Sequence, residues 1–358
     1  MNIGVYGPEL DSDRVGAPEY CLQQTIPHLR NHASVTLITH ERKNHPLYEE
    51  QHIIPRSFDR FNREINKAEF DMVYFCGFAH RDIPLLLSSP TVLAYHGDIQ
   101  WVEPYLNYGD DPTRASRRER MIEITKLCQY DHVIYVSNDV RNRTENRYSR
   151  LAPPSTVVYN GLDHELYQPT FSDCVLDKYG IEQPYVFHLS NFSRKKNPDR
   201  LIRAFDEAAN YNDVNFVIAG GGWKDSTMID KLMNETKIED QALVLGYVPE
   251  DDLPSLYAGA EVFVFPSLHE SFGLPVIESM ACSTPVITAN SYAIPEIAGS
   301  AVIYCDNTSI KSIANSIEYI LKCDDVRKRY TVAGKQRASG FSWDLRAEKL
   351  YDIFKMIV

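Results

Sequence analysis

The sequence of 358 residues predicts an α/β protein built from two successive doubly wound units, each with a parallel sheet between layers of helices. A chain of this length exceeds one ordinary core, and 44% hydrophobic residues suffice to bury two. Short β-branched and aromatic runs alternate with longer amphipathic stretches, as parallel sheets require. The alternation stops once, at a segment rich in proline and turn residues, and then starts again.

Five short runs in the first unit predict strands, and helix-like sequence follows each of them. These runs are 2–7 (NIGVYG), 34–39 (SVTLIT), 71–76 (DMVYFC), 91–97 (TVLAYHG) and 132–137 (HVIYVS). The segment LAPPSTVVYNGLDHELYQP then interrupts the periodicity with prolines and an Asn-Gly turn. We therefore place the first domain at residues 1–170.

The pattern resumes in a second domain, predicted at residues 171–340, with six further strands. They are YVFHLS, NFVIAGG, ALVLGY, VFVFPS, PVITAN and AVIYCD. Residues 341–358 predict a closing helix that packs back on the domains through apolar side chains near helical spacing, namely Phe341, Leu345, Leu350, Ile353 and Phe354. Two such units leave a cleft at the carboxyl ends of their strands, where a ligand is expected to bind.

Composition and charge exclude several classes of function. The formal net charge of -12 argues against a dedicated nucleic-acid binder. The seven cysteines stand singly, without metal-ligand spacing, which favours reduced and mostly buried thiols and no metal site. The opening residues lack the features of a signal peptide, and no run of about 18 apolar residues occurs. We therefore expect a cytoplasmic protein.

Other nucleotide-binding and metal-binding motifs are absent or incomplete. The first strand lacks the G-x-G-x-x-G of dinucleotide-binding dehydrogenases, and AGGGWKDST lacks the G-K-[ST] ending of a P-loop. His28 and His32 have helical spacing, but HLRNH lacks the glutamate of a zinc protease. The pair Asp11 and Asp13 resembles a metal-holding DxD motif, although a solvated loop is the favoured interpretation.

The segment EVFVFPSLHESFGLPVIESMACSTPVITAN begins as a buried strand and passes through a polar loop to a helix opened by Gly273 and Pro275. Unpaired N–H groups at such a helix start favour an anion, and a diphosphate fits there. Glu270 lies just before the helix and Glu278 about one turn inside it. Two carboxylates beside a diphosphate need hydroxyl donors, which indicates a ribose at one end and a hexose at the other.

These residues carry a resemblance to a known family. HESFGLPVIE resembles the E-x7-E signature of family 4 glycosyltransferases, retaining enzymes of the GT-B fold, in which two Rossmann-like domains face a central cleft. The resemblance extends over nearly the whole chain, through the segments VVYNGLDHELYQP, NFSRKKNPDRLIRAF, FVIAGGG and VLGYVPEDDLPSLYAGAEVFVFPS.

The resemblance implies a role for each matching residue of the second domain. Glu278 would bind the ribose hydroxyls and Glu270 the transferred sugar, with backbone contacts from Ser271, Phe272, Gly273 and Leu274. Tyr247 and Val248 lie where the family holds the nucleobase, after Gly246.

A basic turn, SRKKN, is expected to supply positive charge to the departing diphosphate. Lys196 occupies the position of the family's lysine. The family's arginine, five or six residues earlier, is replaced here by Asn191 and Ser190. Arg194 is a nearby second cation proposed to take its place, and a solvated basic turn is the alternative.

Two residues of the first domain match the family. His96, at the end of a predicted strand, corresponds to a histidine near the acceptor and the transferred sugar. Gly16 precedes a helix and would bring backbone N–H groups to the diphosphate, although Ala17 stands where the family often has a second glycine.

Eight arginines lie between residues 114 and 150, and Arg143, Arg147 and Arg150 are spaced to share one helical face. One hypothesis is that this face contacts an anionic membrane, at its inner side, or a lipid phosphate acceptor. The alternative is a helix face that is solvated or paired with local acids.

The resemblance implies a glycosyltransferase that moves a sugar from a nucleotide diphosphate sugar to an acceptor hydroxyl with retention of anomeric configuration. Neither a metal nor a cofactor beyond the nucleotide-sugar co-substrate is expected, and the acceptor is a glycan, a lipid-linked sugar or a small molecule. The alternatives are a nucleotide-sugar epimerase of the same fold and a non-catalytic nucleotide-sugar-binding protein.

Overall fold

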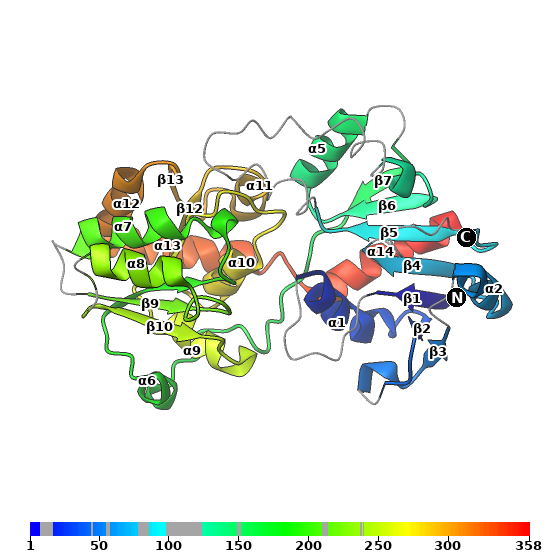
Figure 1. Ribbon diagram of the computed structural model, residues 1–358, viewed down its shortest axis with the longest axis horizontal. Coiled ribbons are helices and arrows are strands. Elements are labelled where there is room, and N and C mark those ends of the chain that lie inside the picture. Colours follow the sequence, from blue (N-terminus) through cyan, green and yellow to red (C-terminus); the bar gives the residue numbers. More distant parts are fainter. Residues whose placement is uncertain are drawn as a thin grey trace. The chain divides into compact units, whose positions relative to one another are not determined.

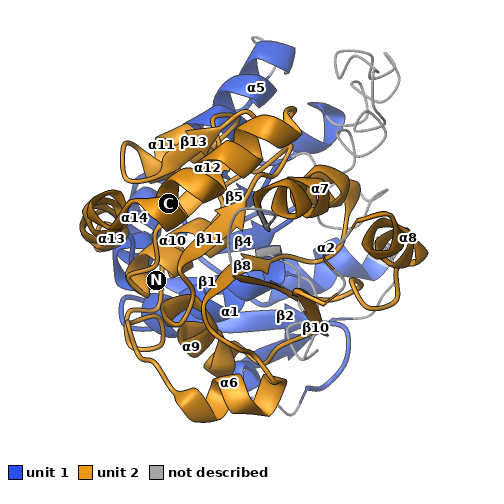
Figure 2. Cartoon of the chain, turned by 90° about the vertical axis from the view of Figure 1, so that its left-hand side faces the viewer, with its two compact units in different colours: residues 1–98, 113–161, 341–358 blue, residues 99–112, 162–340 orange. Residues whose placement is uncertain are grey.

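A computed structural model describes residues 1–7, 17–43, 46–54, 58–77, 86–97, 124–148, 152–209, 214–236, 238 and 240–358. The chain divides into two compact units (Figure 2). Within the described residues, unit 1 contains those up to 97, those from 124 to 161, and 341–358, and unit 2 contains 162–340. Each unit has its own parallel sheet, so the predicted α/β class is confirmed.

Unit 1 contains a seven-stranded sheet in the order β3-β2-β1-β4-β5-β6-β7 (Figure 1). Its strands, all paired in parallel, are β1 Asn2–Tyr6, β2 Ser34–Thr39, β3 Gln51–Ile53, β4 Met72–Cys76, β5 Thr91–Tyr95, β6 His132–Tyr135 and β7 Ser155–Val157. The strand order runs outward in both directions from β1 and β4. This topological switch is the place where doubly wound sheets bind ligands.

Helices cover both faces of the unit 1 sheet. On one face, α1 (Ala17–Leu29) and α14 (Trp343–Ile357) pack together and share one buried cluster with the strands. On the other face, α2 (Phe58–Lys67) brings the ring of Phe61 to 5.3 Å from that of Tyr6. Two further helical elements among the described residues of this unit are η1 (Pro46–Tyr48) and α5 (Asn138–Tyr148).

Two strands, β3 and β7, form where the sequence pattern predicted none. Both are three-residue strands at the edges of the sheet, too short to show the alternation that marks a strand. Strand β7 lies in the proline-rich segment that we interpreted as the domain connection.

The division between the units falls after residue 161, before the expected boundary at 170. Contacts of Tyr167 explain the difference, because its hydroxyl donates to Glu250 (3.3 Å) and its ring centroid lies 6.4 Å from that of Tyr257, both in unit 2. The residues that follow Gly161 therefore pack with the second unit.

The closing helix α14 forms where residues 341–358 predicted it, and it belongs to unit 1. One residue assigned to its apolar face is wrong, because Leu345 is 39% exposed whereas the neighbouring Arg346 is only 2% exposed. The Arg346 guanidinium donates to Thr25 Oγ1 (3.2 Å) and to the carbonyls of Val158 (2.9 Å) and Tyr159 (3.1 Å). These neutral acceptors allow the cation to be buried.

Unit 2 contains a six-stranded parallel sheet in the order β10-β9-β8-β11-β12-β13. Its strands are β8 Tyr185–Leu189, β9 Asn215–Ala219, β10 Ala242–Gly246, β11 Val262–Phe265, β12 Val286–Ala289 and β13 Ile303–Cys305. Its helices are α6 Asp173–Tyr179, η5 Arg194–Lys196, α7 Pro198–Ala209, α8 Thr227–Glu235, η6 Glu250–Asp252, α9 Leu253–Ala258, α10 Leu274–Ala281, α11 Ile294–Ala298, α12 Ile310–Lys322 and α13 Asp324–Ala338. All six predicted strands are present.

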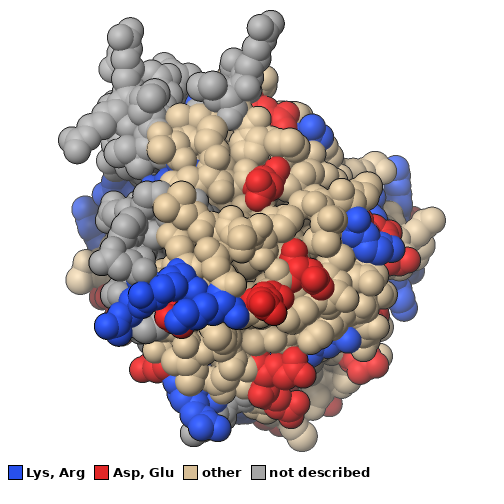
Figure 3. Space-filling model, turned by 90° about the vertical axis from the view of Figure 1, so that its right-hand side faces the viewer, with Lys and Arg blue, Asp and Glu red and all other residues tan. Residues whose placement is uncertain are grey.

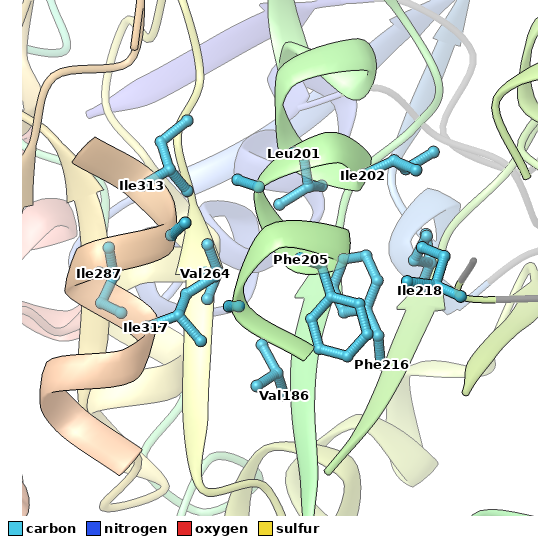
Figure 4. Close-up of a cluster of buried hydrophobic side chains, with 14 of the residues drawn as sticks. Val186, Leu201, Ile202, Phe205, Phe216, Ile218, Val264, Ile287, Ile313 and Ile317 are labelled. Atoms are coloured by element: carbon cyan, nitrogen blue, oxygen red, sulfur yellow. The ribbon is translucent and has the colours of Figure 1, made fainter. Parts of the chain in front are cut away.

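The core of unit 2 lies on both faces of this sheet. On the face drawn in Figure 4, α7 and α12 cover the strands, and the stacked rings of Phe205 and Phe216 lie 4.4 Å apart. On the other face, the ring of Tyr257 from α9 packs 5.3 Å from Phe187 and 5.1 Å from Phe263. Burial of each large apolar side chain stabilises the fold by about 1.5–3 kcal/mol, so packing on both faces stabilises the sheet.

The cysteines of the described segments are all free thiols. Cys21, Cys76, Cys282 and Cys305 are buried, whereas Cys128 and Cys174 are exposed. The described residues include no group of three His, Cys, Asp or Glu side chains placed to hold a metal. In the same part of the chain, no helix has the length and apolar character needed to cross a membrane.

Candidate active site

The topological switch of unit 2 lies between β8 and β11, which are neighbours in the sheet. Parallel neighbours end at the same edge, so the loops that follow them meet there. The loop after β8 carries Lys196, and the loop after β11 carries Glu270. The Leu268 N–H donates to the Lys195 carbonyl (2.7 Å), which joins the two loops directly.

Asn197 fixes the backbone next to Lys196. It is fully buried and adopts a left-handed conformation with φ of 62°, which Asn tolerates better than most residues. Its side-chain amide donates to the carbonyls of Pro266 (3.1 Å) and Asn307 (2.7 Å). Asn307 in turn donates to the Ser267 carbonyl (2.8 Å). The loops after β8, β11 and β13 are thus held together by two asparagine side chains.

Lys196 and Glu270 form an ion pair at this edge. Lys196 Nζ lies 2.6 Å from Glu270 Oε1, and the two side chains are 14% and 12% exposed. The ammonium also lies 4.8 Å from the centre of the Phe265 ring. The structure therefore brings together a cation and a carboxylate that are far apart in the sequence.

The helix that follows Glu270 begins where it was expected, because Gly273 is the residue that caps α10. Gly273 has φ of 99°, and a β-carbon on it would come within 2.7 Å of Ile294 Cδ1. Only glycine fits this left-handed backbone without strain. Pro275 stands in the first turn, and the positive end of the helix dipole lies beside Glu270.

Glu278 occupies the second turn of α10 and is only 6% exposed. The Tyr257 hydroxyl donates to its Oε2 atom (3.0 Å). Burial raises the pKa of Glu278 to about 8, the negative charge of Glu250 acts in the same direction, and the Tyr257 hydrogen bond opposes both. Glu278 is therefore no ordinary solvated glutamate at a helix start.

The residues expected near a nucleobase follow β10. Tyr247 is 53% exposed, whereas Val248 is buried at 5%. Gly246 has φ of 76°, and its carbonyl accepts from the Gly220 N–H (2.6 Å). The turn thus presents one aromatic ring to solvent beside an anchored backbone.

Ser190, one of the two residues that stand where the resemblance places an arginine, is hydrogen-bonded to a buried histidine. His188 is fully buried, with Nδ1 2.8 Å from the Val264 carbonyl and Nε2 2.8 Å from Ser190 Oγ. A carbonyl can only accept, so Nδ1 carries the proton and Nε2 accepts from Ser190. Burial lowers the pKa of His188 to about 4 and keeps it neutral. Arg194, the second expected cation, is exposed in η5.

In unit 1, His96 directly follows β5. Its Nε2 atom lies 3.8 Å from Cys76 Sγ at the end of the neighbouring strand β4. Burial lowers the pKa of His96 to about 3, and the positive charge of Arg346 adds to this effect. Both effects favour the neutral imidazole. Gly16, Arg150 and the Asp11–Asp13 pair lie outside the described residues.

The basic face predicted around α5 is partly neutralised by local acids. Arg143 Nε lies 2.9 Å from Asp139 Oδ2, and Arg141 Nε lies 2.9 Å from Glu145 Oε1, both one helical turn apart. Arg147 lies in the last turn of the same helix. On the face drawn in Figure 3, basic and acidic side chains are interspersed. His28, for its part, contacts Asp344 Oδ1 at 2.5 Å.

Four residues with these structural roles were not predicted from the sequence, namely Asn197, Asn307, Tyr257 and Arg346. Their contacts join segments that are far apart in the chain, and no local motif marks them. Of these four, Asn197 could have been noticed, because Asn tolerates positive φ and here it directly follows the lysine of the basic turn.

Comparison with known proteins assigns a family to both halves of the chain. Residues 177–337 match the model of glycosyl transferases group 1, and residues 17–166 match that of Glycosyltransferase Family 4. A relative from Escherichia coli, O-antigen chain mannosyltransferase B, is 33% identical over 187 residues. That match covers 51% of this chain and 49% of the relative, so it spans about half of each.

Solved structures share the fold. Sucrose-phosphate synthase from Thermosynechococcus elongatus has a TM-score of 0.81 at 18% identity, with 99% of each chain covered. The Anabaena protein HepE, solved in complex with UDP and glucose, has a TM-score of 0.77 at 18% identity, with 99% of this chain and 100% of that chain covered. The family matches in both halves and the shared fold together show that this chain belongs to the GT-B glycosyltransferases, with a family 4 region followed by a group 1 region.

Proposed function

We propose that the protein transfers a sugar from a nucleoside diphosphate sugar to an acceptor hydroxyl, with retention of anomeric configuration and without a metal. The observation that carries the proposal is the Lys196–Glu270 ion pair beside the start of α10, at the switch point of unit 2. Such a donor needs a cation and helix N–H groups for its diphosphate, and a carboxylate for its sugar hydroxyls. The HepE complex with UDP and glucose supports a nucleotide-sugar donor.

The donor's parts are assigned by chemistry. The diphosphate lies at the start of α10, with backbone contacts from Ser271, Phe272, Gly273 and Leu274 and charge from Lys196. Glu270 accepts hydrogen bonds from the transferred sugar, and Glu278 from the ribose. The base lies at Tyr247 and Val248. Arg194 is an auxiliary cation, and for Gly16 we keep the diphosphate role that the family resemblance implies.

In the reaction, the bond between the anomeric carbon and the diphosphate oxygen breaks, and a bond to the acceptor oxygen forms on the same face of the sugar. The leaving phosphate takes the acceptor's proton. Lys196 and the helix dipole stabilise the charge that grows on the diphosphate, so the step requires no metal. His96, being neutral, serves as a hydrogen-bonding group near the transferred sugar rather than as a charge.

The acceptor is a glycan, a lipid-linked sugar or a small molecule, and the name of the Escherichia coli relative favours a glycan. Membrane contact through Arg143, Arg147 and Arg150 is not part of this proposal, because Arg143 is paired with Asp139.

Incubation with UDP-glucose, UDP-N-acetylglucosamine and GDP-mannose, with and without sugar acceptors, tests the proposal. Acceptor-dependent release of the nucleoside diphosphate supports a transferase. Interconversion of the donor sugar would identify an epimerase, and binding without turnover a binding protein. An inverted product by NMR would contradict retention. Glu278→Ala should mainly weaken donor binding, whereas Glu270→Ala and His96→Ala should mainly lower turnover.

A further inference from the structure

Tyr257 is locked in place on the inner face of α9. It is fully buried, and its ring packs edge-on against Phe187 and Phe263 from the sheet. Its carbonyl accepts a hydrogen bond from Thr284 Oγ1 (2.5 Å). The hydroxyl therefore has a fixed position, 3.0 Å from Glu278 Oε2.

This hydrogen bond leaves one side of the Glu278 carboxylate available. The Tyr257 hydroxyl donates to Oε2, and the ionised carboxylate can only accept. Among the residues that the structure describes, Oε1 has no hydrogen-bond partner. A buried carboxylate with one oxygen held and the other available suits a ligand that brings hydroxyl donors.

The surroundings of Glu278 otherwise disfavour its charge. Burial and the carboxylate of Glu250 both raise the pKa of Glu278, to about 8, and only the Tyr257 hydrogen bond lowers it. Cys282, one turn further along α10, has its own pKa raised by burial and by Glu278. Among the described residues, no cation acts on Glu278, and the Tyr257 hydroxyl is the group there that favours its ionised form.

We propose that Tyr257 is a positioning residue for the donor site, which holds the Glu278 carboxylate for the ribose hydroxyls and couples donor binding to release of a proton from Glu278. The inference rests on the proposed function, because it assumes that Glu278 binds the ribose. In the step, the O–H bond of the Glu278 carboxyl group breaks, the proton passes to solvent, and the ribose hydroxyls donate to the resulting carboxylate.

The direction of the pH dependence follows from the environment of Glu278. Near pH 7 most of the free protein carries neutral Glu278, so nucleotide affinity should rise as pH increases towards 8 and level off above it. Tyr257→Phe keeps the ring and removes the hydroxyl. Loss of this bond should move the midpoint upward by about one pH unit, which weakens binding at pH 7 by about tenfold.

Isothermal titration with UDP and with GDP, from pH 6 to 9 in two buffers of different ionisation enthalpy, tests the inference. We expect the wild type to release part of a proton at pH 7. Tyr257→Phe should bind about tenfold more weakly at pH 7, with the deficit shrinking towards pH 9 and kcat at saturating donor nearly unchanged. Glu278→Gln should lose the proton release.

Tyr185→Phe is the matched control. Tyr185 is also a buried tyrosine, and its hydroxyl donates to the Leu256 carbonyl of the same helix α9 (2.8 Å) and not to Glu278. This variant should lower stability while leaving the pH profile of binding unchanged. A purely structural role for Tyr257 would make the two variants behave alike.

Each outcome decides the inference. A wild type that binds nucleotide without releasing a proton between pH 7 and 8 overturns it, even if Tyr257→Phe does not fold. A Tyr257→Phe protein with wild-type affinity and pH profile also overturns it, while weaker binding by Glu278→Gln would leave the proposed function standing. Failure of the wild type to bind either nucleotide at any pH overturns both.

Discussion

The ion pair between Lys196 and Glu270 allows the candidate site to be tested through stability as well as activity. Lys196→Met keeps an apolar chain beside Phe265 but leaves Glu270, 12% exposed, without its cation. Removing one partner of a fully buried pair costs about 3–5 kcal/mol. Since some solvent reaches both side chains here, we expect a loss of about 2–3 kcal/mol. Glu270→Gln should have a similar effect, because it leaves the Lys196 ammonium unpaired.

The double variant separates the pair from its surroundings. With both charges removed, no buried charge is left alone, so the loss should be smaller than the sum of the single losses by about 1–2 kcal/mol. Urea unfolding of the four proteins measures these free energies. Hydrogen exchange in peptides from α7 and α10 assigns the loss to unit 2.

Activity provides the second measurement. If Lys196 stabilises the departing diphosphate, Lys196→Met should lower kcat by about 100-fold, and Lys196→Arg should recover part of it. Single-variant stability losses below about 0.5 kcal/mol, or losses that simply add in the double variant, would refute the reasoning. Either result would mean that the pair is a solvated surface contact.

Three further predictions concern single residues. His96 should remain neutral from pH 5 to 9, because its pKa of about 3 lies far below that range. The pH–rate profile of His96→Asn should therefore keep the wild-type shape despite a lower kcat. Loss of one limb of that profile in the variant would contradict this. Gly273→Ala should destabilise the protein by about 1–3 kcal/mol, because φ is 99° and the added methyl meets Ile294. Thermal unfolding measures the loss of stability and UDP titration the effect on binding, with Ala281→Gly as a control for helix propensity. Burial raises the folded-state pKa of Glu278 from the ordinary 4.5 to about 8, so its contribution to stability is fully present below pH 4.5 and is lost as pH rises towards 8. The melting temperature of Glu278→Gln relative to wild type should therefore rise from pH 5 to pH 8, and a constant difference would disprove the shift.

Most of the fold was predictable because each long strand carries its own local pattern. Each of the eleven apolar runs predicted as strands forms a strand, and these strands belong to two parallel sheets. The edge strands β3 and β7 were not predictable, because three residues carry no periodicity and their pairing depends on a neighbour. Leu345 was assigned to the wrong face of α14 for a related reason. Its spacing is helical, but the packing of unit 1 buries Arg346 instead.

The candidate site was only partly predictable. The sequence determined that a polar loop with Glu270 precedes a helix start at Gly273, because glycine and proline constrain the backbone locally. Only the tertiary structure decided that Lys196 lies 2.6 Å from Glu270 and that Tyr257 donates to Glu278. The first contact joins the loops that follow β8 and β11, which meet because these strands are neighbours in one parallel sheet. The second joins helices α9 and α10, which pack against each other. The buried environment of Glu278, and with it the raised pKa, likewise depends on packing that no single segment encodes.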